Sequence, residues 1–232
     1  SNNKFTHKLP NNIRYKHLPK MNGSKKVCEA TKDVTTPYVG LVADDDYFLE
    51  SSLKSGASFL DDNPDYVSVQ GRYYKFELTE NQVTFSSRYA LHRCYKSVES
   101  EDRATRIANT FNPYMHQSYA LIRTDVFIKS WKFLDSISVE GEDDARSRSY
   151  HCELSQSFVP MCYGKHKALP VLWMVRDYYI FDHVRRQKFL ADQSRNDNSI
   201  SYHYIRFNNS IKEVEAFLDS DFFLHLKKTF RL

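Results

Sequence analysis

The 232-residue sequence lacks several features that would point to common protein classes. Its four cysteines include no Cys-x-x-Cys pair, so a cysteine-built zinc site is not expected, and the scattered spacing fits free thiols in a reducing compartment. No apolar run approaches the roughly 20 residues that a membrane-spanning helix needs. No signal peptide is visible either, but the sequence begins at Ser1 without a methionine, so that absence carries no weight. We expect a cytoplasmic protein.

The sequence also lacks a large excess of either acidic or basic residues. The formal net charge is +4, and acidic and basic residues are mixed through most of the chain, so we expect no nucleic-acid partner. Residues 1–26 are the exception, with seven Lys or Arg and no acid. Such a run could attract a diphosphate, an acidic glycan or the anionic lipids at the inner face of a membrane, and it is equally consistent with a solvated surface.

Apolar patterning predicts strands that alternate with helices. Residues 38–43 form a short apolar run typical of a buried strand, and apolar side chains recur at helical spacing through residues 49–62. Further strands are expected at 13–18, 66–70, 117–123 and 168–175, a hairpin at 72–86, and helices at 25–32, 97–110, from Thr124, and from Arg146 to Pro160. This order predicts an α/β fold with a mostly parallel sheet flanked by helices over residues 1–183, and a small helical extension over residues 184–232.

Three adjacent carboxylates, Asp44, Asp45 and Asp46, follow the apolar run at 38–43. Two unit charges about 4 Å apart repel by roughly 4 kcal/mol at an effective dielectric near 20, and a bound divalent cation would remove that cost. A hard ion such as Mn²⁺ or Mg²⁺ takes carboxylate oxygens from the protein and its other ligands from phosphate and water. In open α/β sheets, ligands bind beyond the carboxyl ends of strands, where this cluster falls.

Two other interpretations of the acidic cluster remain open. Aspartate also favours helix N-termini, although the cluster stops three residues before the helix expected to begin at Leu49. A metal-dependent phosphatase or nucleotide hydrolase would use Asp44 as its nucleophile. Such enzymes usually place Thr or Val at the next alternate position, whereas Tyr47 and Phe48 follow here.

Short motifs occur in a fixed order between about residues 20 and 185. They are Thr-Pro-Tyr-Val from Thr36, Ala-Asp-Asp-Asp-Tyr-Phe from Ala43, Phe-Leu-Asp-Asp-Asn-Pro-Asp-Tyr from Phe59, Gln-Gly at Gln70, His116, Tyr-Ala-Leu-Ile-Arg from Tyr119, Glu-Leu at Glu153, Gly-Lys at Gly164, Leu-Pro at Leu169 and Val-Arg at Val175. The series resembles bacterial GT-A-type glycosyltransferases of the family-2-like sugar transferase group. An Asp-x-Asp motif alone is weak, whereas the ordered series is much more specific.

The resemblance implies a fold and a donor site. It implies a GT-A, Rossmann-like nucleotide-binding sheet, with Asp44 and Asp45 beside the nucleotide-sugar. It also implies that Asp46 is the direct metal ligand, with Asp44 and the late histidine His183 near the metal or diphosphate. Relatives normally begin with a strand, a turn and a helix that bind the base, and no clear apolar strand of that kind precedes Ile13.

Residues for catalysis follow from both the resemblance and the chemistry. Glu153 resembles the acceptor-side general base, and it lies beside the apolar stripe of its expected helix. Lys26 and Arg176 would neutralise the departing diphosphate, while His116 and Tyr119 would face the acceptor. An exposed helical glutamate, a structural histidine or a surface cation is the plainer alternative for each.

Together these features predict a metal-dependent glycosyltransferase of polysaccharide biosynthesis. It would transfer a sugar, with inversion, from a nucleotide-sugar donor to a hydroxyl of a glycan or glycolipid acceptor. The alternatives are the phosphatase or nucleotide hydrolase described above and a non-catalytic glycan-binding module.

Overall fold

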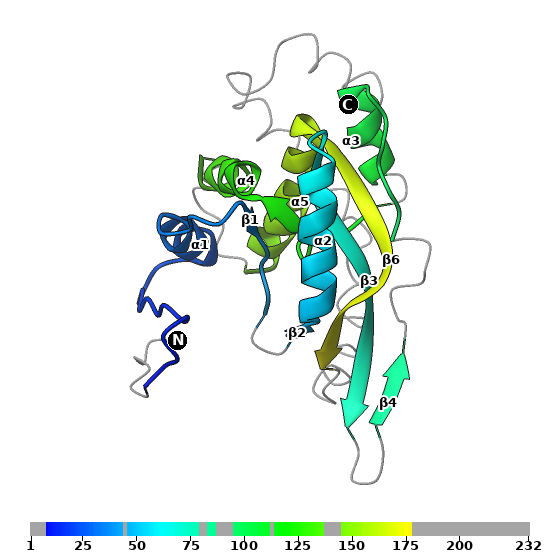
Figure 1. The fold of residues 1–232 in the computed structure, drawn as a ribbon. Helices are drawn as coiled ribbons and strands as arrows, with labels where there is room; N and C mark the ends of the chain where they lie inside the picture. Colours follow the sequence, from blue (N-terminus) through cyan, green and yellow to red (C-terminus); the bar gives the residue numbers. More distant parts are fainter. Residues whose placement is uncertain are drawn as a thin grey trace, which may run out of the picture.

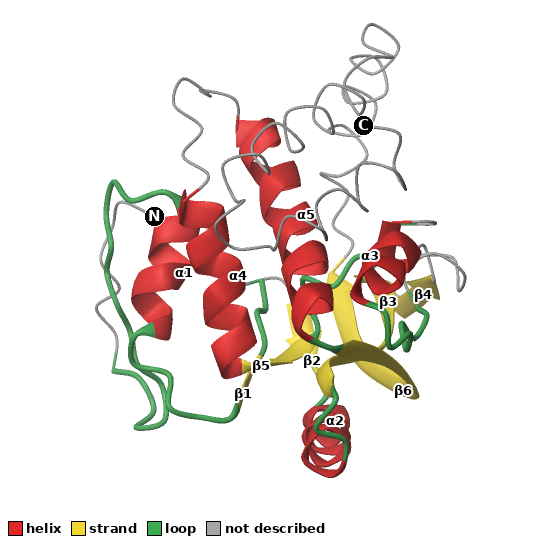
Figure 2. Ribbon diagram, turned by 90° about the horizontal axis from the view of Figure 1, so that it is seen from above, coloured by secondary structure: helices red, strands yellow, loops and turns green. Residues whose placement is uncertain are grey.

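The computed structural model describes residues 8–43, 46–78, 83–86, 95–111, 114–136 and 145–177. These ranges contain one sheet with helices on both of its faces (Figures 1 and 2). The helices are α1 (Gly23–Thr31), α2 (Glu50–Asp62), α3 (Arg103–Phe111), α4 (Thr124–Ser136) and α5 (Ala145–Tyr163). The strands are β1 (Tyr38–Val39), β2 (Asp46–Phe48), β3 (Tyr66–Leu78), β4 (Val83–Ser86), β5 (Leu121–Arg123) and β6 (Lys165–Asp177). None of the helices described is long and apolar enough to cross a bilayer.

The sheet is mixed and mostly antiparallel, so the predicted mostly parallel, Rossmann-like sheet is wrong for the described residues. Its strand order is β1-β5-β3-β6-β2, with β4 paired to β3. Only β3 and β6 pair in parallel; the other pairings in this part of the chain are antiparallel. The predicted alternation of strands and helices does occur, and β1 and β3 run in the same direction. However, β5 lies between them in the opposite direction, which the order of elements along the chain does not reveal.

Two apolar clusters fill the space on either side of the sheet. The larger lies under α4 and α5 and includes Phe127, Trp131 and Leu134, the stripe expected for the helix that begins at Thr124. The smaller lies under α2 and is centred on Leu60, Val69 and Trp173. A Cβ on Gly56 of α2 would lie 2.8 Å from the Trp173 ring, so this helix approaches the sheet closely because position 56 has no side chain.

Several element boundaries differ from those predicted. Residues 13–18 are not a strand; this extended segment is held on α1 by bonds from Arg14 and Lys16 to the carbonyls of Asp33 and Glu29. The strand predicted at 38–43 is only β1. Pro160 does not end α5, because Gly164 N–H donates to the Pro160 carbonyl at 3.2 Å and the last turn continues. The predicted helical extension at 184–232 lies outside the described residues.

At the end of the sheet where α2 ends and β3 and β6 begin, cationic side chains bind backbone carbonyls and carboxylates. Arg123 donates to the carbonyls of Leu60, Asn63 and Tyr66 at 2.6, 3.2 and 2.8 Å. Carbonyls in the last turn of a helix have no intrahelical donor, so Arg123 caps α2.

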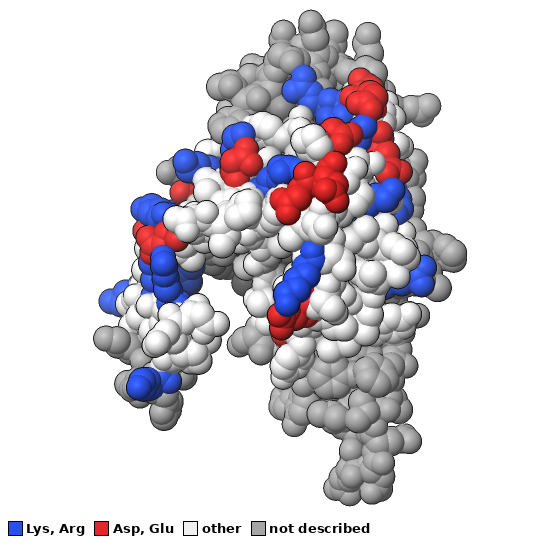
Figure 3. Space-filling model, in the orientation of Figure 1, with Lys and Arg blue, Asp and Glu red and all other residues white. Residues whose placement is uncertain are grey.

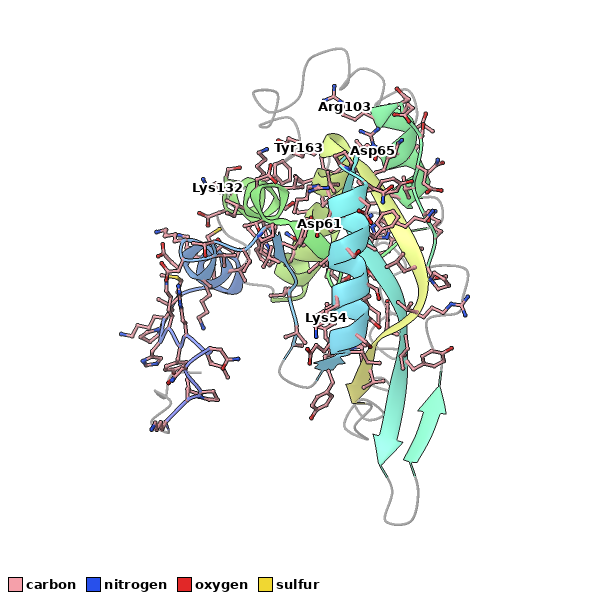
Figure 4. The ribbon with its side chains drawn as sticks, in the orientation of Figure 1. Lys54, Asp61, Asp65, Arg103, Lys132 and Tyr163 are labelled. Carbon is pink, nitrogen blue, oxygen red and sulfur yellow. The ribbon has the colours of Figure 1, made fainter. Side chains whose placement is uncertain are left out.

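Arg106 acts similarly, donating to the carbonyls of Met161 near the end of α5 and of Ser100 and Glu101. Lys165 pairs with Asp65 at 2.7 Å and with Glu101. We call this region, defined by Arg106, Arg123 and Lys165, the capped end. Figure 3 shows acidic and basic side chains gathered near it, and Figure 4 labels Asp65 and Arg103 there.

Candidate functional site

Asp46 and Arg176 form a cross-strand ion pair at the opposite end of β6. The two residues lie directly opposite each other in the antiparallel β2–β6 pairing. Arg176 Nε donates to Asp46 Oδ1 at 2.8 Å, and Asp46 is only 7% exposed. Asp46 Oδ2 is buried without a hydrogen-bond partner among the residues described. Because a buried carboxylate oxygen without a partner is costly, this atom is suited to a further donor or a cation.

Aromatic rings surround the other face of Arg176. Its guanidinium carbon lies 4.9 Å from the centroid of the Tyr119 ring, within the range of a cation–π contact. The Tyr119 ring in turn lies 6.2 Å from the ring of Tyr73 on β3 and 5.4 Å from the ring of His116. Arg176 is therefore held between a carboxylate on one side and an aromatic cluster on the other.

Glu153 of α5 belongs to the same electrostatic environment. Partial burial raises the pKa of its carboxyl above the usual range, and the positive charge of Arg176 offsets part of that rise. A carboxylate with a raised pKa is a stronger base than an exposed one. Glu153 and Asp46 thus interact with one guanidinium in different ways: Asp46 accepts a hydrogen bond from it, and Glu153 is affected by its charge.

His116 is half-buried, with its Nδ1 atom shielded from solvent, and its imidazole is neutral near neutral pH. Burial first, and the nearby charge of Arg176 second, lower the pKa of its imidazole to about 4. Its Nδ1 has no hydrogen-bond partner in the described part of the chain. A neutral imidazole with an unused nitrogen is able to donate to or accept from a bound hydroxyl, depending on its tautomer.

Other buried polar atoms were not identified as functional from the sequence. Both side-chain atoms of the Gln70 amide lack a partner within the described ranges, as do Ser155 Oγ and Gln156 Nε2 of α5. Gln70 lies two residues after Ser68 in β3 and shares its sheet face, where Ser68 bonds to His166. The available signals were a glutamine beside the apolar residues Val67 and Val69 and the Ser-Gln-Ser run in the middle of α5.

The structure brings together some of the predicted site residues and not others. Arg176 connects Asp46, Glu153, His116 and Tyr119, which come from β2, α5 and the segment before β5. Asp44, Asp45 and His183 lie outside the described residues. Among the described residues, no group of three or more His, Cys, Asp or Glu is arranged to hold a metal, so Asp46 supplies at most one side chain of such a set.

Lys26 lies elsewhere, on α1. It lines a cavity of about 620 Å³ between α1 and the N-terminal segment, together with Arg14, Tyr15, Lys16, His17, Leu18, Val27, Ala30, Asp33 and Val34. This lining includes none of the residues grouped around Arg176. Lys26 is therefore not part of that group in the described chain.

No protein-family model matches the chain, and no curated protein sequence matches it significantly. The functional argument therefore depends on the chemistry of the grouped residues.

Proposed function

We propose that this chain is a metal-dependent glycosyltransferase, which transfers a sugar from a nucleotide-sugar to a hydroxyl of a glycan or glycolipid. One observation carries the proposal. Sequence reasoning assigned Asp46 to a metal, Arg176 to a diphosphate and Glu153 to proton transfer, and these three residues from three elements share one electrostatic environment. A donor site beside an acceptor-side base is the arrangement that sugar transfer requires.

Asp46 and Arg176 would act on the donor. The buried, unpartnered Asp46 Oδ2 fits a hard divalent cation such as Mn²⁺ or Mg²⁺, with Asp44 and His183 as the further ligands that the resemblance implies. A cation bound there would offset the negative charge that develops on the departing diphosphate. Arg176, fixed over Tyr119, would add a second positive charge toward the same group.

Glu153 would act on the acceptor. It would accept the proton of the attacking hydroxyl while the oxygen bonds to the anomeric carbon. Its raised pKa strengthens it as a base, and Arg176 keeps a larger fraction of it ionised. Tyr119 would offer its ring and hydroxyl to a sugar, and a single positioned base suits direct displacement with inversion.

A panel of nucleotide-sugars, each with and without Mn²⁺, tests this function by thermal unfolding. A true donor stabilises the folded protein by about 2.7 kcal/mol at a concentration of 100 times its Kd. Glu153→Gln should keep that metal-dependent stabilisation but lose sugar transfer, because only the proton acceptor is removed. Glu50→Gln is the matched control, since Glu50 is an exposed helical glutamate, and it should keep both.

The other outcomes separate the alternatives. Stabilisation by no nucleotide-sugar would contradict the proposal. Hydrolysis of a simple phosphate ester without any acceptor would favour the phosphatase or nucleotide hydrolase. Glycan binding by the unaltered protein, with no transfer from any donor, would favour a binding module.

A further inference from the structure

We propose that Arg176 and the divalent cation compete for Asp46, so that the guanidinium is a resident counter-ion which the metal displaces on binding. This inference rests on the proposed function, because it concerns the same metal. It goes beyond that function by giving Arg176 a role before the donor arrives: it sets the affinity for the metal.

The burial of Asp46 is the first step of the argument. Its side chain has no solvent exposure, whereas that of Arg176 is 21% exposed. A fully buried carboxylate needs a positive partner, and removing that partner is strongly destabilising. Arg176 therefore supplies the positive charge beside Asp46 in the metal-free protein, and the cation would supply it in the metal-bound protein.

The second step is the geometry of the carboxylate. Arg176 Nε occupies Oδ1 at 2.8 Å, while Oδ2 is buried without a hydrogen-bond partner in the described part of the chain. A cation held by Oδ2 would place two positive centres on one carboxylate in a largely dehydrated setting. Their mutual repulsion makes the two partners antagonistic.

The third step is that Arg176 has somewhere to go. Its guanidinium already lies over the Tyr119 ring, with the Glu153 carboxyl close enough for the charge of Arg176 to lower the Glu153 pKa. A guanidinium released from Asp46 keeps both favourable contacts, since cation–π and long-range charge interactions do not require the Asp46 bond. Displacement therefore does not leave Arg176 without compensation.

Mn²⁺ binding without donor, followed by the electron paramagnetic resonance signal of free Mn²⁺, tests the competition. Arg176→Gln should bind Mn²⁺ about tenfold more tightly than the unaltered protein, within the 5–150-fold range typical of coupled sites. Arg72→Gln is the matched control, because Arg72 also stacks on a tyrosine ring, that of Tyr95 at 4.8 Å. It should leave the affinity unchanged.

Thermal unfolding gives a second readout that does not depend on activity. Mn²⁺ should raise the Tm of Arg176→Gln more than that of the unaltered protein, because the variant has lost its resident counter-ion. If Arg176→Gln folds only with Mn²⁺ present, that result supports the proposal. Arg176→Lys, with a single ammonium in place of the planar group, should then show an intermediate affinity.

Two outcomes are adverse, and they are distinguishable. If Asp46→Asn binds Mn²⁺ as well as the unaltered protein does, Asp46 is not a metal ligand and the donor site of the proposed function fails with it. If Asp46→Asn loses Mn²⁺ but Arg176→Gln and Arg176→Lys bind it no more tightly than the unaltered protein, the competition alone is overturned and the proposed function stands.

Discussion

The two ends of the β3–β6 pair use their arginines in different ways. At the capped end, Arg123 and Arg106 donate to backbone carbonyls, and so satisfy groups that a helix terminus leaves open. At the other end, Arg176 binds a carboxylate whose second oxygen has no partner in the described chain, beside His116 with an unused Nδ1. Arginines that donate hydrogen bonds to open backbone carbonyls stabilise the fold, whereas Arg176 lies among polar groups to which a ligand could bind.

Arg123→Met should have the largest effect on stability. The change removes three hydrogen bonds from a charged donor and leaves carbonyls of Leu60, Asn63 and Tyr66 without them, so we expect a loss of about 3 kcal/mol in the free energy of unfolding. Urea unfolding measures the loss. A change below about 1 kcal/mol would show that the capped end contributes little, and the contrast with Arg176 would disappear.

Gly164→Ala should have the next largest effect on stability. A Cβ at this position would lie 2.5 Å from Val67 Cγ1 and 2.8 Å from the Asp65 carbonyl oxygen, where α5 passes into β6 at the capped end. Such overpacking costs about 2 kcal/mol. Gly23→Ala of α1 is the control, because a Cβ there meets nothing within 4 Å, and it should be neutral or slightly stabilising. Equal effects of the two changes would contradict the tight packing of Gly164.

Buried His166 and half-buried His116 should then show the difference between the two ends in the pH dependence of stability. Burial lowers the pKa of His166 to about 3 and that of His116 to about 4. Below pH 6.5 the two histidines become protonated in the unfolded chain but remain neutral in the folded protein. Stability is therefore fully present above pH 6.5 and falls as pH decreases toward 4, by up to about 1.4 kcal/mol per pH unit for each histidine.

Replacing either histidine by glutamine should remove its share of that slope, as measured by urea unfolding between pH 7.5 and 4.5. At pH 7.5 the two variants should differ. His166→Gln loses the 2.8 Å bond to Ser68 and about 1 kcal/mol, whereas His116 Nδ1 has no partner to lose within the described residues. A pH slope unchanged in both variants would mean that neither imidazole is held neutral.

Lys54→Gln should have the smallest effect and gives a baseline. Lys54 pairs with Glu50 on the exposed face of the first turns of α2 (Figure 4). Exposed pairs of this kind are screened by solvent, so no measurable change in unfolding is expected. A clear loss would mean that surface charges matter more here than the comparison assumes.

Local patterns in the sequence predicted the helices well. The stripe of Phe127, Trp131 and Leu134 is buried as expected, since helical periodicity is a property of neighbouring residues. Strand direction was not predictable in this way. The insertion of β5 between β1 and β3 depends on residues more than 80 positions apart, as in the pairing of Tyr38 with Arg123.

The candidate site shows the same limit to local reasoning. Motif order identified Asp46, Glu153 and Arg176 individually, and their grouping is an outcome of the fold. The Asp46–Arg176 pair spans 130 positions, and no local spacing indicates that these two residues face each other. Lys26 met the same chemical criterion as Arg176, a cation near a motif, yet it lines a cavity that includes none of the residues around Arg176.

One strand, β6, carries Lys165 at its first residue and Arg176 one residue before its last. Its pairing with β3 is interrupted between Gln70 and Tyr73, so the alignment of the two halves is set by a short irregular step. An insertion or deletion of one residue there would turn every later side chain to the opposite face. Natural variants that differ in length at this step should therefore be rarer than those that differ in composition. A single insertion or deletion would change the register of the Arg176 end of the strand relative to its Lys165 end.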